Sequence, residues 1–261
     1  MEITLTGKKA LVGGSSKGIG RAVAEQLAAS GASVTLMARS ETVLKEIVKA
    51  LPTDKGQQHD YLVVDFSDFN AYQKIIKGFF ERTAIDILIN NTQGPEAGGA
   101  LEKEVEDYQN AFDLLFKCAV YTTTLALPHM QQQGWGRIIN IASVSVKEPL
   151  SYLVLSNSIR AALVTWAKTL SLEVAAHNIT VNTTLTGYFD TERIAELNHK
   201  KAEKLGIPPS AVRKTMEESV PLKRIGDPKE YGALVAFLAS LQASYITGTT
   251  IPIDGGLLKS V

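Results

Sequence analysis

The sequence predicts an α/β fold, in which a parallel sheet is covered by helices on both faces. Two observations predict it. Short apolar segments of strand character alternate with helical patterns from one end of the chain to the other. No Pro/Gly/Ser-rich linker, internal repeat or low-complexity tract divides the 261 residues. We therefore expect residues 1–261 to form a single domain rather than two small ones.

The first four elements are apolar or helical runs with clear stops. Residues 9–12 form a short apolar strand that ends in glycines, and residues 21–30 form a helix that ends at the next glycine. Residues 33–37 are β-branched and apolar, which predicts a second strand. Residues 41–51 have a helical pattern that a proline ends. The chain thus begins as strand, helix, strand, helix.

Five further strands and three long helices continue this alternation. The strand at 61–64 ends at Asp65, and the strand at 85–89 ends in a pair of asparagines. Helical patterns lie between the later strands. The remaining predicted strands are residues 137–141, 180–182 and 249–253, and the remaining helices lie near 104–132, 157–176 and 228–240.

One region departs from this rhythm. Residues 188–220 are charged and helical in pattern, contain Pro208-Pro209, and connect a strand to the next regular helix. An insertion of this length is more typical of a functional segment than of a plain connector. We therefore expect a lid or substrate-binding segment there, although its mixed charge identifies no substrate.

Composition excludes several classes of partner. The chain has 27 Lys plus Arg and 27 Asp plus Glu, so no net field attracts nucleic acid or an anionic membrane. No apolar run reaches the roughly 18 residues of a membrane span, and the start has neither a basic nor an apolar leader region. The single cysteine, Cys118, lies in a helical pattern and is expected to be a buried thiol. We expect a cytoplasmic protein with no metal, nucleic-acid or membrane partner.

A glycine-rich loop, GGSSKGIG at 13–20, follows the first strand and opens the first helix. Glycines permit a tight turn and let the backbone approach a pyrophosphate, and the helix N-terminus presents free N–H groups. The alternative is a glycine-rich turn that binds nothing, but the strand–loop–helix context favours a dinucleotide site. The expected contacts are Gly14, Ser16, Lys17, Gly18, Ile19 and Gly20.

The end of the second strand indicates which nucleotide binds. An NAD site usually places a carboxylate there to accept hydrogen bonds from the ribose 2′-OH. This chain has LMARS at 36–40 instead, and Arg39 can pair with a 2′-phosphate. Lys17 can reach the same phosphate. Two cations and a missing acid favour NADP(H) over NAD(H), while the alternative for Arg39 is a solvated surface arginine.

Polar residues end the next two strands. Asp65 can cap the adenine side of a nucleotide, and the amides of Asn90-Asn91 can knit neighbouring strands. Either could equally be an ordinary strand-end polar residue.

These residues, in this order, resemble the classical short-chain dehydrogenase/reductase family, and most of all its 3-oxoacyl-carrier-protein-reductase-like members. The resemblance covers essentially the whole chain. Besides the glycine loop, Asp65 and the asparagine pair, it rests on IINIAS at 138–143, ITVN at 179–182, the segment 187–191, PLKRIG at 221–226, YITG at 245–248 and DGG at 254–256.

The resemblance implies a single Rossmann domain with seven parallel strands, assembled as a homotetramer or homodimer. It implies reversible hydride transfer between a nicotinamide and a small carbonyl or alcohol substrate. It further implies that Asp65 meets the adenine and Asn90 its ribose. The other implied contacts are those of Gly14, Gly18, Ile19 and Gly20 with the pyrophosphate and ribose, and those of Gly187 and Thr191 with the nicotinamide carboxamide.

The chain departs from the family's active site of Asn, Ser, Tyr and Lys. Ser143 matches the serine, which polarises the substrate oxygen. Thirteen positions later Ser156 stands where the pattern has Tyr, and four further on Arg160 stands where it has Lys. The spacing after Arg160 fits the family, so both positions are present and hold other residues. Leu115 occupies the position of the Asn.

These changes affect proton transfer. An aliphatic hydroxyl such as that of Ser156 is a far weaker acid than a phenol and normally needs an adjacent base. Arg160 cannot be that base, since a guanidinium stays protonated, although it can donate hydrogen bonds to ribose hydroxyls. Tyr152 and Tyr188 offer substitute phenols, with packing tyrosines as the favoured alternative. Because proton transfer typically contributes about 10²–10⁴-fold, we expect a slow enzyme rather than an inactive one.

The sequence leaves three functions open. The first, which we favour, is an NADP-dependent oxidoreductase with a non-standard proton donor. The second is a nucleotide-binding protein without redox turnover that acts as a sensor or assembly partner. The third is a lyase or isomerase that uses the same pocket. The catalytic residues we expect are Ser143, Ser156 and Arg160.

Overall fold

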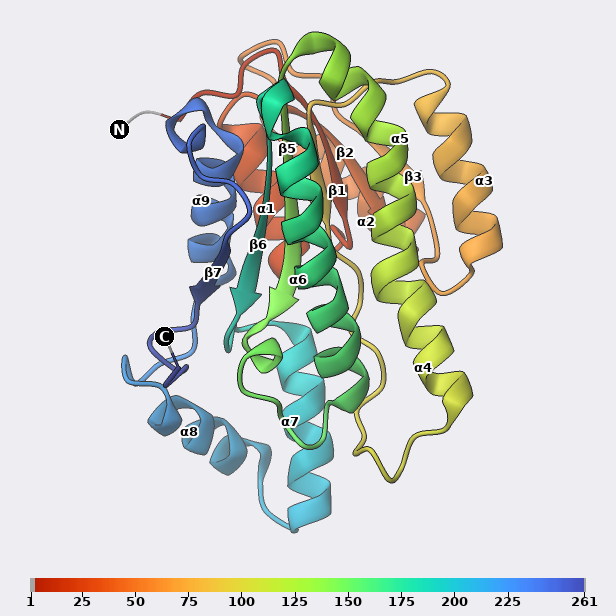
Figure 1. Cartoon of the computed structure of the whole chain (residues 1–261). Helices are drawn as coiled ribbons and strands as arrows, with labels where there is room; N and C mark the ends of the chain where they lie inside the picture. Colours follow the sequence, from red (N-terminus) through yellow and green to blue (C-terminus); the bar gives the residue numbers. More distant parts are fainter. Residues whose placement is uncertain (1–2, 261) are drawn as a thin grey trace.

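A sheet of seven parallel strands forms the centre of the protein (Figure 1). The computed structural model describes residues 3–260. The strands are β1 Lys9–Gly13, β2 Ser33–Ala38, β3 Asp60–Val63, β4 Ile87–Asn90, β5 Gly136–Ser143, β6 Ile179–Thr186 and β7 Thr250–Ile253. Their order is β3-β2-β1-β4-β5-β6-β7, so the chain winds outward from β1 in both directions. The predicted doubly wound α/β fold is therefore confirmed, and a ligand crevice is expected where the order reverses, at the carboxyl ends of β1 and β4.

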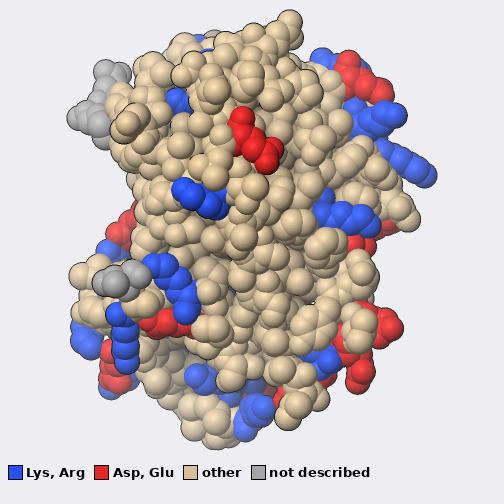
Figure 2. All heavy atoms as spheres, viewed as in Figure 1, with Lys and Arg blue, Asp and Glu red and all other residues tan. Residues whose placement is uncertain are grey.

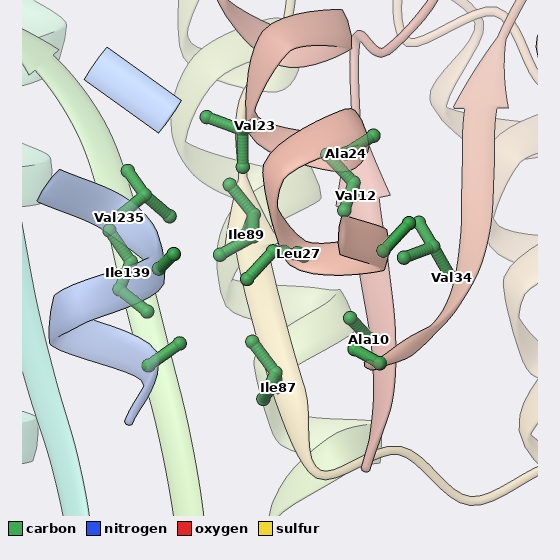
Figure 3. Packing of buried hydrophobic residues seen from close by; sticks show 14 of the residues in the cluster. Ala10, Val12, Val23, Ala24, Leu27, Val34, Ile87, Ile89, Ile139 and Val235 are labelled. Carbon is green, nitrogen blue, oxygen red and sulfur yellow. The ribbon is translucent and has the colours of Figure 1, made fainter. Parts of the chain in front are cut away.

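Helices cover both faces of this sheet. One face carries α1 Gly18–Ala29, α2 Glu41–Ala50 and α9 Pro228–Ala239, and the other carries α3 Phe69–Phe80, α5 Cys118–Gln133 and α6 Val154–Val174. Figure 3 shows the first layer, where Leu27 of α1 and Val235 of α9 pack with Ile89 and Ile139 of the central strands. All four side chains are buried. Burial of each such side chain stabilises the fold by about 1.5–3 kcal/mol.

Helix α3 is absent from the sequence prediction, although its pattern is visible afterwards. Asp68 caps the helix, because its side chain accepts a hydrogen bond from a backbone N–H of the first turn at 3.0 Å. Tyr72, Ile76 and Phe79 then recur at helical spacing and face the core. The helix covers the edge of the sheet beyond β1 on the second face.

Strands β5 and β6 are longer than predicted. The prediction ended them at Ile141 and Asn182, whereas they continue to Ser143 and Thr186. The extension of β6 includes Thr184, which is polar yet fully buried because its hydroxyl is hydrogen-bonded inside the core. A polar residue that is satisfied internally does not show in an apolar pattern. The two extensions carry the strand ends to the edge of the sheet where the cleft lies.

Two more helices, α7 Glu192–Leu205 and α8 Pro209–Ser219, lie beyond the carboxyl ends of β5 and β6 (Figure 1). They pack on each other, and Arg213 of α8 donates two hydrogen bonds to Asp190 at 2.8 and 2.9 Å. The segment 188–220 is thus mostly helical, while its role as a lid stays a prediction. Within residues 3–260, no helix is both long and apolar enough to cross a membrane.

Candidate functional site

An open cleft of about 1340 Å³ lies between the carboxyl ends of the strands and α7. This volume exceeds the roughly 300–1,000 Å³ of a typical small-molecule pocket, so it can hold a dinucleotide beside a substrate. Among the predicted site residues, Asp65 and Asn90 lie outside its lining. The predicted residues that line it are Gly14, Ser16, Lys17, Gly18, Ile19, Gly20, Arg39, Ser143, Ser156, Arg160, Gly187 and Thr191.

The glycine loop requires glycine for two physical reasons. Gly14 and Gly18 have φ values of +57° and +55°, a left-handed conformation that L side chains rarely adopt. A Cβ on Gly20 would lie 2.2 Å from the Gly14 carbonyl oxygen, so a side chain there would break the turn. At the start of α1 no side chain caps the helix and no acidic residue lies in the first turn. The free N–H groups and the positive end of the helix dipole are therefore available to an anion.

Two residues that sequence reasoning did not single out individually hold this loop in place. The Asn91 Nδ2 donates to the Gly13 carbonyl at 3.0 Å, which ties the end of β4 to the end of β1. The fully buried Ser15 hydroxyl accepts a hydrogen bond from the Met37 N–H at 2.9 Å, which ties the loop to β2. The loop is thus preorganised from both neighbouring strands. Ser15 could have been suspected only as a polar residue inside a loop that packs against apolar strands.

Two cations lie on the side of the cleft that follows β2. Arg39 and Lys17 both line the cleft, and neither is buried. The Lys17 Nζ lies 3.6 Å from a carboxylate oxygen of Glu196 on α7. Arg39 takes part in no ion pair within the described residues. The structure thus brings together the two cations predicted for a 2′-phosphate, and no carboxylate occupies the tip of β2.

Asp65 lies close to this edge but is engaged with its own turn. Its Oδ1 accepts hydrogen bonds from the Ser67 N–H at 2.9 Å and from the Ser67 hydroxyl at 2.6 Å. These hydrogen bonds lower the pKa of Asp65, and the Arg39 charge adds a smaller lowering effect. The carboxylate is ionised at neutral pH, and its contact with an adenine stays a prediction.

Asn90 uses its side chain inside the protein. Its Nδ2 donates to the Asn140 Oδ1 at 2.8 Å and to the Thr123 hydroxyl at 3.1 Å. These bonds join β4 to β5 and to α5, which is the strand-knitting role considered for this residue. Its contact with a ribose stays a prediction. Asn140, which sequence reasoning did not select, is fully buried beside it.

Ser143 and Ser156 face the cleft from different elements. Ser143 ends β5, and its Oγ accepts a hydrogen bond from the Ser145 N–H at 3.2 Å. Ser156 lies in the first turn of α6. Because the Ser143 hydroxyl proton is not used in this bond, it is free to be donated to a substrate oxygen.

Two phenols line the same part of the cleft. Tyr152 precedes α6, and Tyr188 follows β6. Within the described residues neither phenol oxygen has a hydrogen-bond partner. Burial raises the pKa of both tyrosines, and for Tyr152 the nearby Tyr188 raises it further. Both therefore stay protonated at neutral pH, and each can donate a proton only as a weak acid.

Arg160 is the buried cation of the site. Its side chain projects from α6, only 9% of the residue is exposed, and its Nη1 donates to the Ile141 carbonyl of β5. Burial lowers the pKa of Arg160 to about 10. The guanidinium is therefore still charged at neutral pH, so it donates hydrogen bonds and does not accept a proton.

Leu115 lies in a π-helical turn, Asp113–Lys117, between α4 (Val105–Phe112) and α5. It is buried and lines, with Arg160 and Asn90, an inner cavity of about 10 Å³. That volume is at the lower limit for one water molecule, roughly 10–15 Å³. The leucine side chain offers no hydrogen bond to a water there, so Leu115 cannot anchor a relay water as an amide would.

Cys118, and Lys147 in the loop that follows Ser143, lie outside the cleft lining. Cys118 is buried, and burial raises the pKa of its thiol to about 12, which fits the buried thiol predicted for it. Lys147 is exposed. Within the described residues, no three His, Cys, Asp or Glu side chains are grouped to hold a metal ion.

Residues 14–258 match the family model described as enoyl-(acyl carrier protein) reductase. The chain is 31% identical to 3-oxoacyl-[acyl-carrier-protein] reductase FabG of Aquifex aeolicus, over 98% of this chain and 100% of that protein. It is 32% identical to the NADPH-dependent reductase BacG of Bacillus subtilis, over 97% of this chain and 99% of that protein.

A solved structure shows the same fold. L-sorbose reductase from Gluconobacter frateurii, complexed with NADPH and L-sorbose, matches with a TM-score of 0.92 and 30% sequence identity. The match covers 100% of both chains. The likeness therefore extends over the sheet, the cleft and the helices α7 and α8.

Proposed function

Because this chain belongs to the short-chain dehydrogenase/reductase family, we propose that it is an NADP(H)-dependent oxidoreductase for a small carbonyl or alcohol substrate. The observation that carries the proposal is one cleft that holds both halves of such a site. The cofactor half consists of the uncapped N-terminus of α1 together with Lys17 and Arg39. The substrate half contains the Ser143 hydroxyl. The NADPH named for the Bacillus subtilis reductase and for the sorbose reductase supports this cofactor.

The residues present fit the cofactor. The free N–H groups of the α1 N-terminus suit a pyrophosphate, and a Cβ at Gly20 would close the turn that presents them. Among residues 3–260, Arg39 has no ion-pair partner at the place where a 2′-phosphate is expected, and its planar fork suits two phosphate oxygens. Gly187 and Thr191 line the opposite wall, where the carboxamide is expected.

The chemistry divides between the cofactor and the chain. NADPH, when bound, supplies a hydride to the carbonyl carbon, and the carbonyl oxygen takes up one proton, which yields an alcohol and NADP⁺. Ser143 donates a hydrogen bond to that oxygen and stabilises its developing negative charge, which typically is worth about 10²–10³-fold in rate. Ser156 orients the substrate but is too weak an acid to replace a phenol.

The proton then reaches the oxygen by a slower route. Tyr152 and Tyr188 are the phenols nearest in the cleft wall, and both are protonated at neutral pH. We expect their donation, or that of solvent in the open cleft, to limit the rate. The absent proton relay lowers the rate by about 10²–10⁴-fold without preventing hydride transfer.

A nucleotide titration tests the cofactor assignment. NADPH is expected to bind at least tenfold more tightly than NADH, and Arg39→Ala is expected to remove most of this difference. Arg82→Ala, which changes an arginine after α3 and outside the cleft, serves as the control. Equal affinities for the two nucleotides, or tighter NADH binding, would contradict the assignment.

One observation favours a second function, a nucleotide-binding protein without turnover. Ser156, Arg160 and Leu115 place no ionisable acid at the centre of the site. A panel of carbonyls and alcohols distinguishes the two functions. Turnover by the natural chain supports the oxidoreductase, whereas turnover only in the double variant Ser156→Tyr, Arg160→Lys supports the binding protein.

A further inference from the structure

Arg160 is a buried cation whose hydrogen-bonding capacity is largely unused. A guanidinium has five N–H donors, and within the described residues only Nη1 of Arg160 has an acceptor, the Ile141 carbonyl. No carboxylate of the described chain pairs with it. A buried charge without a partner is costly, so an arginine in this state indicates a missing ligand.

Arg137 shows how the same protein treats a buried arginine that has a structural role. Only 2% of Arg137 is exposed, and it too has no carboxylate partner. Its Nη1 and Nε donate to three backbone carbonyls at 2.8, 3.1 and 3.4 Å, and its guanidinium lies 4.4 Å from the centre of the Trp135 ring. Arg137 is therefore satisfied by the protein, whereas Arg160 is not.

The charged groups nearest to Arg160 in the cleft do not pair with it. Besides burial, the Tyr231 phenol raises the pKa of Arg160, and Arg193 on α7, a second cation in the cleft wall, lowers it. Glu196 on α7, which lines the same cleft, is already shared between Lys17 at 3.6 Å and Arg193 at 3.8 Å. At position 156, where the family has a tyrosine that can ionise, this chain has a serine, which stays neutral. Within the described residues, Arg160 therefore has no carboxylate of its own to neutralise its charge.

Arg160 is held close to Ser143, the residue that is expected to contact the substrate carbonyl oxygen. The carbonyl that holds its Nη1 belongs to Ile141, two residues before Ser143 on β5, or about 7 Å along the strand. Arg160 and Ser143 both line the cleft. A substrate whose carbonyl oxygen meets Ser143 can therefore present a charged group to Arg160 only if the two groups are a few bonds apart.

We propose that Arg160 binds a carboxylate of the substrate, so that the protein acts on short oxo acids and the corresponding hydroxy acids. The planar guanidinium fork matches a carboxylate and forms two parallel hydrogen bonds with it. A ribose diol would accept hydrogen bonds from the same donors but would leave the charge uncompensated. The inference rests on the oxidoreductase proposed above and names its substrate class.

Binding of acid and ester pairs tests the inference without requiring turnover. The probes are pyruvate, acetoacetate and levulinate, each beside its methyl ester, because the three acids place the carboxylate at increasing distance from the carbonyl. Their dissociation constants are measured by calorimetry on the free protein and on the protein saturated with NADP⁺. We expect at least one acid to bind at least tenfold more tightly than its ester.

Substitutions at position 160 identify the residue responsible. Arg160→Met is expected to reduce the affinity for the preferred acid to that for its ester, and to leave the affinity for NADP⁺ within about twofold. Arg160→Lys, which keeps the charge but not the fork, is expected to retain part of the preference. Melting temperatures establish that both variants are folded.

Two results would overturn the inference. One is that no acid binds more tightly than its ester. The other is that Arg160→Met weakens NADP⁺ binding and leaves the ratio of acid to ester unchanged, which would assign Arg160 to the ribose. A failure of the oxidoreductase proposal has a different signature, since then no carbonyl oxidises NADPH, whether or not the nucleotide binds.

Discussion

Ser156 and Arg160 set the character of this site at the scale of single residues. The hydroxyl is too weak an acid to act alone, and the guanidinium stays charged at neutral pH with a pKa of about 10. Both line a cleft whose Ser143 hydroxyl proton is free. The site is therefore better equipped to bind and polarise a substrate than to protonate it.

The two buried arginines predict opposite effects on stability. Arg160→Met removes an unsatisfied buried charge, so we expect the melting temperature of the ligand-free protein to stay the same or rise. Arg137→Met removes a guanidinium that satisfies three carbonyls, so we expect a loss on the order of 3 kcal/mol. Thermal unfolding of both variants measures the difference. Equal destabilisation by the two substitutions would show that Arg160 is as well satisfied as Arg137.

Predictions for single residues succeeded where only one structural role explains the residue type at that position. The loop glycines were predicted correctly to line the cleft. They were recognisable because only glycine fits the turn at Gly18 and Gly20. Asn90 was harder to interpret, because an amide serves equally to bind a ligand or to join strands, and here it joins β4 to β5. The buried Ser15 was not selected, since its role depends on the Met37 backbone of another strand.

At the scale of elements, the junction of β1 and α1 is the most constrained part of the site. Gly20→Ala would place a Cβ 2.2 Å from the Gly14 oxygen, so we expect NADPH affinity to fall at least tenfold. Gly78→Ala in α3 is the matched control, because nothing lies within 4 Å of its Cβ position. The control should bind NADPH normally and gain about 0.5–1 kcal/mol of stability. Unchanged NADPH binding in Gly20→Ala would contradict the assigned loop.

Helix α3 allows the contribution of its N-cap residue, Asp68, to be tested separately. Asp68→Ala removes the only side-chain cap of the helix and is expected to cost about 1 kcal/mol in the free energy of unfolding. Asp68→Asn keeps an acceptor and should cost less. Asp54→Ala removes an exposed charge without removing a cap. Urea denaturation separates the cases, and an equal loss in Asp68→Ala and Asp54→Ala would rule out the cap.

Element boundaries were predicted less well than element order. The sequence placed all seven strands, because each contains β-branched or other apolar residues between turn residues and helical patterns. It ended β6 too early, because Thr183 and Thr184 are polar but buried. Whether a threonine is exposed or hydrogen-bonded to a distant tyrosine is decided by tertiary packing, which a single sequence does not display.

At the scale of the whole molecule, one face is suited to self-association. Figure 2 shows few charged side chains over the middle of the face formed by α5 and α6, with the charges gathered at the edges. Phe112 and Phe116 stack there with ring centres 5.1 Å apart, and Phe116 meets Trp166 of α6 at 6.0 Å. Two exposed residues of α6, Lys168 and Glu173, are charged and lie toward its C-terminal end. The other exposed residues of the helix are uncharged, namely Ser158, Ala162, Thr165, Thr169 and Leu172.

This face predicts a homo-oligomer that a single charge can disrupt. Ala162→Arg is expected to convert the assembly to smaller species, because it places an unpaired charge in an apolar interface. Ala50→Arg, at the exposed end of α2 on the opposite face of the sheet, should leave the assembly intact. Size-exclusion chromatography with light scattering gives the masses. A monomeric natural chain, or the same mass for all three proteins, would exclude this interface.

The fold class was predicted correctly, since alternation of strands and helices without a linker leaves few alternatives to a doubly wound sheet. The position of the cleft then follows from the strand order, because the order reverses between β1 and β4. The substrate and the proton donor do not follow from the fold, because they depend on side chains such as Tyr152 and Tyr188 that loops bring together.

The central claim is that this cleft reduces a carbonyl with NADPH although its acid relay is replaced. Single-turnover oxidation of NADPH, with protein in excess and a panel of carbonyls that includes short oxo acids, tests it most directly. We predict that at least one carbonyl consumes one NADPH per site, and that Ser143→Ala slows this step by about 10²–10³-fold. Consumption of no NADPH by any carbonyl, or an unchanged rate in Ser143→Ala, would contradict the account.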